Sequence, residues 1–410
     1  MKRLTIQVVL ILLICSGCSL FQSNSSLMKP PQLPVQQQEL KQAISQYVPA
    51  QAEWLSPLDD GDTNRIIERD IDGDGEEELI VFYRMPDKTA QMEGVILENR
   101  KGEWKKRTQF NDLGRELQKV EFADLDGDGK DEVLIGFSYS NESSDKALLV
   151  FNVNGDKPEK LFESQYSAFF ADDYNEDGRG ELMLATLVPN QEHNVTLYSY
   201  KDNMEKVDEL KLDPYVYPYY HTVAGYVTPS VKGAVLDSSV GAHSSTSFIV
   251  GVKDGKLKEV KPKGLKEEDL FRATAANSID TNDDGIIEFP VLVEGSEDKP
   301  YVDMPFISEY YQLKDDGEAR FIESTYENVN YQYTWKLPDS WPDVEIDTSG
   351  DRRYVKFISK EDGTVLYDIY AVEKDKAIPD EGWNELSESN QFIYLTKYSP
   401  ERYPENFQAN

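Results

Sequence analysis

The chain has 410 residues, enough for two or three domains with sizeable cores, and its 39% hydrophobic content excludes wholesale disorder. Its 76 Asp and Glu residues outnumber its 43 Lys and Arg residues, which gives a formal charge of −33. So acidic a surface repels nucleic acid and anionic lipid headgroups, and neither is an expected partner.

Residues 1–17 are organised like a secretory signal peptide. Two basic residues precede a stretch over Ile6–Ile14 that is apolar except for Gln7 and is too short for a membrane span of about 20 residues. Two small residues then precede Cys18, an ending that resembles the lipobox of bacterial lipoproteins. The resemblance implies cleavage before Cys18, its lipidation, and attachment to the extracytoplasmic face of the cell membrane. An ordinary secretory signal with a chance cysteine is the alternative.

The segments that follow the signal predict a tether and a short helix. The only other cysteine, Cys15, lies within the signal, so the mature chain keeps one cysteine and forms no internal disulfide. Residues 18–37 are rich in Ser, Gln, Asn and Pro and predict a flexible tether. Residues 38–48 place apolar side chains at helical spacing, so we expect 38–54 to be a helical segment that packs on the body.

Four acidic segments align without gaps and reveal an internal repeat. Each has Asp at position 1, Asp or Asn at position 3, Asp at position 5, Gly at position 6 and Glu at position 9. They start at residues 70, 124, 173 and 280, and the long third interval predicts a degenerate copy near residue 225 that lacks the acids. The candidate metal ligands are Asp70, Asp72, Asp74 and Glu78; Asp124, Asp126, Asp128 and Glu132; Asp173, Asn175, Asp177 and Glu181; and Asp280, Asn282, Asp284 and Glu288.

These residue types at this spacing predict calcium binding. Ca²⁺ takes six to eight oxygen ligands, which carboxylates at positions 1, 3 and 5 of a tightly curled loop can supply. The glycine at position 6 permits the sharp turn. An EF-hand would need a bidentate Glu at position 12 and flanking helices, whereas here position 12 is apolar and each loop runs into a short apolar strand.

A strand, an acidic loop with this sequence motif and a second strand together resemble the FG-GAP or VCBS repeats of integrin-type β-propellers. The resemblance implies a mainly β fold, a β-propeller of about five blades of ~52 residues each over 55–322. A ring of six blades, closed by an irregular blade, is the alternative. In such propellers the calcium loops hold neighbouring strands of a blade together. The resemblance therefore implies that the metal has a structural role and that the binding surface lies elsewhere.

The repeat signal is lost over 323–410, which we expect to form a small α+β module. Strands are predicted over Tyr354–Ile358, Thr364–Val372 and Phe392–Lys397, and a short helix near Glu381–Glu388. Three of the five tryptophans lie here, and core packing is favoured over a ligand platform.

No catalytic residue is assigned. The histidines are His193, His221 and His243, and none belongs to a known metalloprotease or hydrolase motif. The aromatic cluster Tyr215–His221 fits either sugar stacking or packing within a blade.

The sequence therefore favours a non-enzymatic surface lipoprotein with calcium as its cofactor. Its propeller would present a binding face to an extracytoplasmic protein or wall-glycan partner. Two alternatives remain: a surface polysaccharide hydrolase or lyase with its site in the propeller funnel, and an accessory subunit of a membrane machine.

Overall fold

The computed structural model describes residues 35–58, 64–139, 146–155, 157–241, 244–297, 299–376 and 382–409. The predicted signal peptide, Cys18 and most of the predicted tether lie outside these residues. Within the described part of the chain, no helix has both the length and the apolar character needed to cross a membrane.

The described chain is almost entirely β-strand, arranged in antiparallel sheets of four or five strands. The first sheet contains β1 (Glu53–Leu55), β2 (Ile67–Arg69), β3 (Glu78–Arg84), β4 (Met92–Arg100) and β5 (Glu103–Leu113); the second contains β6 (Glu116–Ala123), β7 (Glu132–Ser138), β8 (Lys146–Asn152) and β9 (Glu159–Tyr166). The third contains β10 (Ala168–Asp172), β11 (Glu181–Val188), β12 (Glu192–Tyr200) and β13 (Met204–Lys211); the fourth contains β14 (Tyr219–Thr228), β15 (Val231–Val240), β16 (Ser244–Lys253) and β17 (Lys256–Glu259).

Two further sheets complete the described chain. The fifth contains β18 (Phe289–Glu294), β19 (Phe306–Leu313), β20 (Ala319–Asn328), β21 (Tyr333–Lys336) and β27 (Phe407–Ala409). The sixth contains β22 (Val344–Thr348), β23 (Tyr354–Ser359), β24 (Val365–Glu373), β25 (Asn384–Glu388) and β26 (Phe392–Thr396). The helix α2 (Val35–Ile44) precedes the first sheet, and 3₁₀ turns occur at η2 (Glu267–Leu270), η3 (Tyr301–Asp303), η4 (Val329–Tyr331), η5 (Pro400–Arg402) and η6 (Pro404–Asn406).

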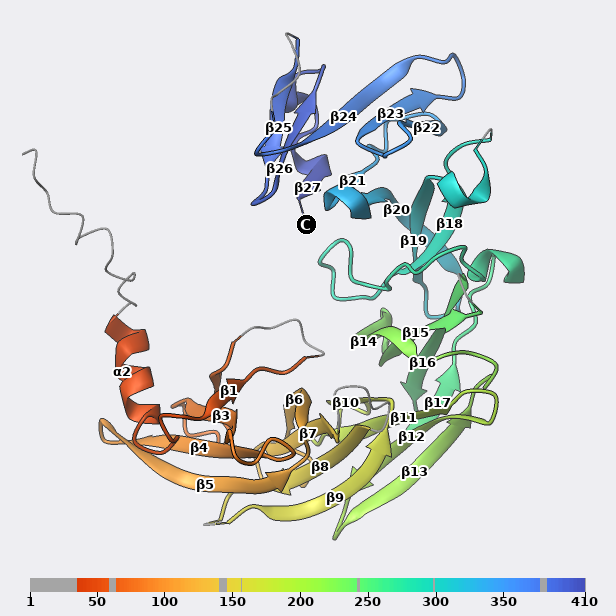
Figure 1. Cartoon of the computed structure of the whole chain (residues 1–410). Coiled ribbons are helices and arrows are strands. Elements are labelled where there is room, and N and C mark those ends of the chain that lie inside the picture. Colours follow the sequence, from red (N-terminus) through yellow and green to blue (C-terminus); the bar gives the residue numbers. More distant parts are fainter. Residues whose placement is uncertain are drawn as a thin grey trace, which may run out of the picture.

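The second, third and fourth sheets are four-stranded meanders in which each strand pairs with the next one in the chain. In Figure 1 successive sheets follow one another along an arc, with β6, β10 and β14 on its concave side and β9, β13 and β17 on its convex side. This is the blade arrangement of a propeller. The predicted fold class, mainly β with about five propeller-type blades, is confirmed.

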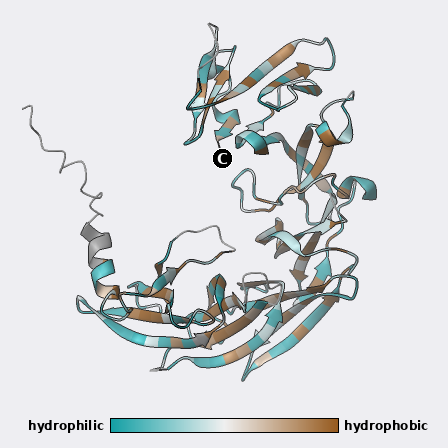
Figure 2. Cartoon of the chain, in the orientation of Figure 1, coloured by the Kyte–Doolittle hydropathy of each residue, from teal (hydrophilic) through white to brown (hydrophobic). Residues whose placement is uncertain are grey.

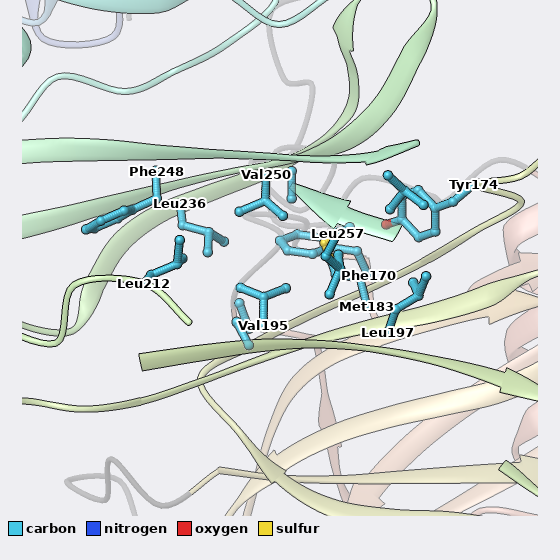
Figure 3. Close-up of a cluster of buried hydrophobic side chains, with 14 of the residues drawn as sticks. Phe170, Tyr174, Met183, Val195, Leu197, Leu212, Leu236, Phe248, Val250 and Leu257 are labelled. Atoms are coloured by element: carbon cyan, nitrogen blue, oxygen red, sulfur yellow. The ribbon is translucent and has the colours of Figure 1, made fainter. Parts of the chain in front are cut away.

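Hydrophobic cores lie between successive sheets. The side chains of Phe170, Met183 and Val195 from the third sheet meet Leu236 and Val250 from the fourth, as Figure 3 shows. Equivalent clusters join the first sheet to the second, the second to the third, and the fourth to the fifth. Hydrophobic residues therefore concentrate in the central strands, while the outer strands such as β5 and β13 are largely hydrophilic (Figure 2).

The N-terminal helix packs against the first sheet. Ile44 at the end of α2 and the following Val48 are buried against Leu79, Val81 and Val95. The sequence predicts helical spacing over 38–48, and the structure places the α-helix over Val35–Ile44, followed by turns.

The C-terminal region differs from the predicted module in two details. The boundary predicted between residues 322 and 323 falls inside β20, and the fifth sheet continues through β21 to β27. The short helix predicted near 381–388 is wrong in its described part, which forms β25 and pairs with β26. This pairing overrides the helical propensity of the segment. The described residues of this module contain strands and 3₁₀ turns but no α-helix.

The tryptophans of this region belong mainly to its core. Trp335 is fully buried and stacks on Tyr367 with 4.6 Å between ring centroids. Trp341 packs beside it and donates a hydrogen bond from Nε1 to the hydroxyl of Tyr403 at 3.0 Å. These contacts are those of a packed interior, as the sequence favours.

Candidate metal centres

The four acidic loops share one hydrogen-bonded frame, although they lie far apart in the sequence. In every loop the position-9 glutamate accepts a hydrogen bond from the backbone N–H of position 2, at 2.8–3.0 Å. The position-1 aspartate accepts another from the backbone N–H of the position-6 glycine, also at 2.8–3.0 Å. The repeat read from the sequence is therefore a repeat of structure.

Left-handed backbone conformations at positions 4 and 6 give each loop its curl. The position-6 glycines have φ between +83° and +90°. Position 4 is also left-handed in all four loops: Gly73 and Gly127 occupy it in the first two, and Glu176 and Asp283 in the others, at φ of 60° and 59°. A side chain in this region costs free energy, so the last two loops carry local backbone strain that the first two avoid.

Three of the loops gather acids closely enough to hold one cation. Each group offers one carboxylate oxygen per residue, and these oxygens all lie within 4.8 Å of one another. The groups are Asp70, Asp72 and Glu78; Asp124, Asp126 and Glu132; and Asp280, Asp284 and Glu288.

The other predicted ligands lie in the same loops but are engaged differently. Asp74 and Asp128 at position 5 each accept a hydrogen bond from a backbone N–H two residues further on, at 2.9 Å. In the third loop Asn175 donates its amide to Glu181 and accepts from the N–H of Asp177. Asn282 likewise accepts from the N–H of Asp284 at 2.9 Å.

Side chains from neighbouring strands also face these carboxylates, and the repeat pattern in the sequence does not point to them. Arg107 on β5 lies 2.7 Å from Asp72 and 3.9 Å from Glu78. Asn152 at the end of β8 donates to the second loop, and Gln312 on β19 donates to both Asp284 and Glu288 at 2.9–3.1 Å. The signal that could have found Asn152 and Gln312 is that each follows its loop by one strand and a hairpin.

Burial raises the pKa of the position-9 glutamates. The pKa is raised to about 7 for Glu78, Glu132 and Glu181, and it is also raised for Glu288. Neighbouring carboxylates add to this effect, whereas the bond from the position-2 N–H opposes it. The pKa of Asp284 lies below its ordinary value because the donors around it, Gln312 foremost, outweigh its burial.

The donor set of the first, second and last loops suits a hard divalent cation. The ligands are all oxygens, and like charges crowd within a few ångströms. Asp72 Oδ1 is buried without a hydrogen-bond partner among the described residues, which is the state of an oxygen that a cation would satisfy. The third loop fits less well, because an amide replaces the position-3 acid and already bonds the position-9 glutamate.

Backbone hydrogen bonds join the first three loops into a row. The N–H of Asp131 in the second loop donates to the carbonyl of Ile71 in the first, and that of Gly180 in the third donates to Asp124, both at 2.7 Å. An added Cβ at Gly127 would lie 2.6 Å from the Arg179 side chain. The next loop therefore packs directly over position 4, which explains why glycine occupies that position in the first two loops.

The unit predicted near residue 225 is the β14–β15 hairpin, which turns through Pro229 and Ser230 without an acidic loop. Asp315, from the turn between β19 and β20, accepts hydrogen bonds there from Thr228 Oγ1 and from the backbone and side chain of Ser230, at 2.7–3.0 Å. Lys232 on β15 reaches back to Asp172 at 2.8 Å. The fourth unit thus adds side-chain contacts to both neighbours, and it keeps a backbone bond to the last loop, where the N–H of Ile287 donates to the carbonyl of Tyr226 at 2.8 Å.

The structure separates the three histidines. His193 is buried, with Nδ1 donating to the carbonyl of Asp213 and Nε2 accepting from Tyr219, both at 2.7 Å. His221 lies 3.0 Å from the buried Asp237. His243 lies outside the described residues. Of the aromatic cluster, Tyr215 and Tyr217 are exposed.

Fold and loops together define a protein of propeller-type blades with acidic loops. Residues 70–135, which span the first two loops, match the family described as FG-GAP-like repeat. The chain therefore contains an FG-GAP-like repeat, as its resemblance implied. No curated protein matches the chain.

Several solved structures resemble the chain at low identity. The WD40 domain of SCAP from fission yeast is 12% identical with a TM-score of 0.30, over 85% of this chain and 91% of that one. TolB from Acinetobacter baumannii is 11% identical with a TM-score of 0.28, over 79% of this chain and 64% of TolB. AofleA from Arthrobotrys oligospora is 10% identical with a TM-score of 0.28, over 78% and 86%. At such scores these likenesses carry no argument about function.

Proposed function

We propose that the chain is a non-enzymatic cell-surface lipoprotein, anchored through Cys18 on the extracytoplasmic face of the membrane. Its calcium-stabilised blades present a binding face to an extracytoplasmic protein or wall-glycan partner. The observation that carries the proposal is the recurrence of one acidic loop frame across the blades, because it serves to hold sheets together around a cation. The ligand-binding surface is then free to lie elsewhere.

Calcium supports the folded state by linkage. Since the unfolded chain cannot assemble the three-carboxylate groups, a cation that binds them stabilises the fold. The ligands would be Asp70, Asp72 and Glu78, with the equivalent acids of the second and last loops. Binding also relieves the repulsion that contributes to the raised pKa of Glu78.

The anchor is tested by Cys18→Ser. Stable attachment of a lipoprotein takes two acyl chains, and these are lost with the thiol. We expect the variant to appear in the medium or to accumulate as an unprocessed precursor, as shown by fractionation and intact mass. A variant that is processed and retained in the membrane like the parent chain would contradict the anchor.

The binding role is tested by crosslinking on intact cells, followed by identification of the captured partner. A parallel screen of wall glycans measures both binding and turnover by the purified mature chain. We expect saturable binding without turnover. Turnover of a glycan would instead establish the hydrolase or lyase alternative.

A further inference from the structure

The first acidic loop contains a positive charge that the second lacks, although the two loops carry the same four candidate ligand types. Arg107 on β5 donates from Nη1 to Oδ2 of Asp72 at 2.7 Å, and the same nitrogen lies 3.9 Å from Oε1 of Glu78. Both acids belong to the carboxylate group of this loop. An arginine side chain stays protonated in proteins, so the charge is permanent.

Arg107 is held in this position from the second sheet. Its Nε donates to the carbonyl of Val153 at 3.3 Å, and its Nη2 donates to the side-chain oxygen of Asn154 at 3.2 Å. The side chain of Arg107 is only 9% exposed. Leaving the loop would give up these bonds together with the ion pair, so the guanidinium is a fixed part of the site.

Neutral amides face the carboxylates of two other loops. In the second loop, Asn152 donates to Asp126 at 3.3 Å and to Glu132 at 3.0 Å. In the last loop, Gln312 donates to the acids at positions 5 and 9 at 2.9–3.1 Å. An amide adds no charge and carries an oxygen that can become a calcium ligand, whereas a guanidinium adds a positive charge and has no acceptor.

The other charged side chains near the first two loops lie further from the ligands. Glu76 and Glu77 of the first loop are exposed, and Asp131 of the second loop pairs with Arg69 at 2.5 Å. Among the described residues, Arg107 is the only lysine or arginine that forms an ion pair with a candidate ligand of these two loops. The charge balance at the first group of carboxylates therefore depends on this one side chain.

We propose that Arg107 is a built-in counter-cation that competes with calcium for the first loop. It neutralises part of the loop in the calcium-free protein and repels a bound cation, so the first loop fills only at a higher calcium concentration. The affinity of calcium loops follows the charge count of their ligands, which Arg107 lowers by one. The proposal rests on the calcium sites of the proposed function and gives them an order of filling.

The test is a calcium titration of the mature chain bearing Cys18→Ser, followed loop by loop with amide hydrogen exchange. In the parent chain, residues 70–78 should gain protection at a higher calcium concentration than residues 124–132. Arg107→Gln places an amide opposite Asp72, as in the other loops. Its midpoint at residues 70–78 should fall about tenfold, because a unit charge several ångströms from a divalent cation has an effect of this order even when water screens it.

Melting temperatures distinguish competition from a purely structural role. In EGTA, Arg107→Gln should melt below the parent chain, because Glu78, whose side chain is 3% exposed, loses its counter-charge. Saturating calcium should reduce that difference, since the cation then replaces the charge. An equal loss in EGTA and in calcium would mean that Arg107 acts only as a structural contact, and it would overturn the proposal.

Two further variants separate the charge of Arg107 from its shape and its surroundings. Arg107→Lys keeps the charge and should leave the first loop weak. Arg69→Gln is the matched control, since Arg69 is 49% exposed and pairs with Asp131, which is not a candidate ligand. It should leave the calcium midpoint at residues 70–78 unchanged, and a fall equal to that of Arg107→Gln would overturn the assignment to Arg107.

Asn152→Lys makes the reciprocal change and does not depend on how well Arg107→Gln folds. It places an ammonium beside Asp126 and Glu132, so the midpoint of the second loop should rise. An unchanged midpoint of the second loop in this variant would overturn the proposal, and so would an unchanged midpoint of the first loop in Arg107→Gln.

The outcomes also separate this proposal from the wider one. Calcium-dependent protection at the second loop, with a first loop that does not respond to Arg107→Gln, leaves the proposed function standing and removes only the competition. The absence of calcium-dependent protection at every acidic loop would overturn the calcium sites of the proposed function and the competition with them.

Discussion

The second and third sheets and the fourth are alike in strand order, but the connection between the first two strands differs between them. Acidic loops connect β6 to β7 and β10 to β11, as another connects β2 to β3 in the first sheet. Backbone hydrogen bonds join these three loops in a row. In the fourth, a tight turn replaces the loop. There the buried pair of Asp237 and Arg272 ties β15 to the segment before the fifth sheet.

The difference shows two ways of holding a blade in place. In an acidic loop the carboxylates repel one another and burial raises the pKa of the glutamate, so a bound cation would stabilise the loop. The fourth blade carries its own counter-charge: Arg272 donates to Ser245, Ser247 and Tyr220 as well as lying beside Asp237. Stability should therefore depend on calcium in one region and be independent of it in the other.

The largest effect is expected from Arg272→Met, which leaves the fully buried Asp237 without its cation. Breaking a buried ion pair by removing one partner costs about 3–5 kcal/mol. The loss, measured by urea denaturation, should be the same with calcium and with EGTA, because no acidic loop is involved.

Lys314→Met is the control for this experiment, since it removes only a half-exposed pair with Glu318. Such surface pairs contribute at most about 1 kcal/mol. A loss in Arg272→Met no larger than that of the control would contradict the importance of the buried pair.

Removal of calcium should have the next largest effect. Extracellular modules bind calcium with Kd of roughly 0.1–1 mM, so each occupied site contributes on the order of 1 kcal/mol at millimolar calcium. We expect EGTA to lower the melting temperature by several degrees and calcium, but not magnesium, to restore it. Asp126→Ala should remove part of that shift and Asn282→Ala less of it.

Hydrogen exchange sharpens this prediction by location. Protection that depends on calcium should appear at the loops that begin at residues 70, 124 and 280, and not at the turn through Pro229 and Ser230. An identical melting temperature with and without calcium would contradict the assignment of the acidic loops as calcium sites.

A smaller effect is expected from Gly127→Ala, which tests how the loops pack on one another. Alanine at a φ of +80° is strained by about 1 kcal/mol, and its Cβ would lie 2.6 Å from Arg179 of the next loop. We expect a loss of about 1–2 kcal/mol by urea denaturation. The double variant with Arg179→Ala should recover part of it.

Gly155→Ala is the matched control, since that glycine has no left-handed φ and an added Cβ would meet nothing closer than 3.6 Å. It should be near neutral. If Gly127→Ala behaved like Gly155→Ala, the loops would not be packed in a row.

Much of the fold is predictable from the sequence because its signals are local. Each acidic loop marks the connection into the next strand of its sheet, and the apolar runs that begin at Glu78, Glu132 and Glu181 form β3, β7 and β11. The missing loop near residue 225 is also predictable, because a repeat that skips a period must have a degenerate copy there.

The parts that escape prediction depend on partners distant in the sequence. The pattern of the acidic loops says nothing of Arg107, Asn152 or Gln312, which reach the carboxylates from later strands. His221 and Asp237 lie in ordinary strands, and only their pairing reveals a network. The helix expected near 381–388 is wrong over residues 384–388, because the decisive contact, the pairing with β26, is tertiary.

The smallest expected effect concerns pH and the buried His193, which lies between the third and fourth sheets. Burial lowers its pKa from the ordinary value of 6.5, and its Nε2 accepts from Tyr219, so the folded state holds it neutral. A histidine whose pKa is lower in the folded state contributes stability that is fully present above pH 6.5 and is lost as the pH falls toward the folded value. We therefore compare melting temperatures of the parent chain and His193→Gln in saturating calcium, from pH 7.5 downward. The acidic loops titrate alike in both proteins, so the difference between their melting temperatures isolates His193.

The parent chain should have the higher melting temperature at neutral pH, and the difference should shrink below pH 6.5. A constant difference in melting temperature across that range would mean that His193 contributes to stability only by packing against Phe248.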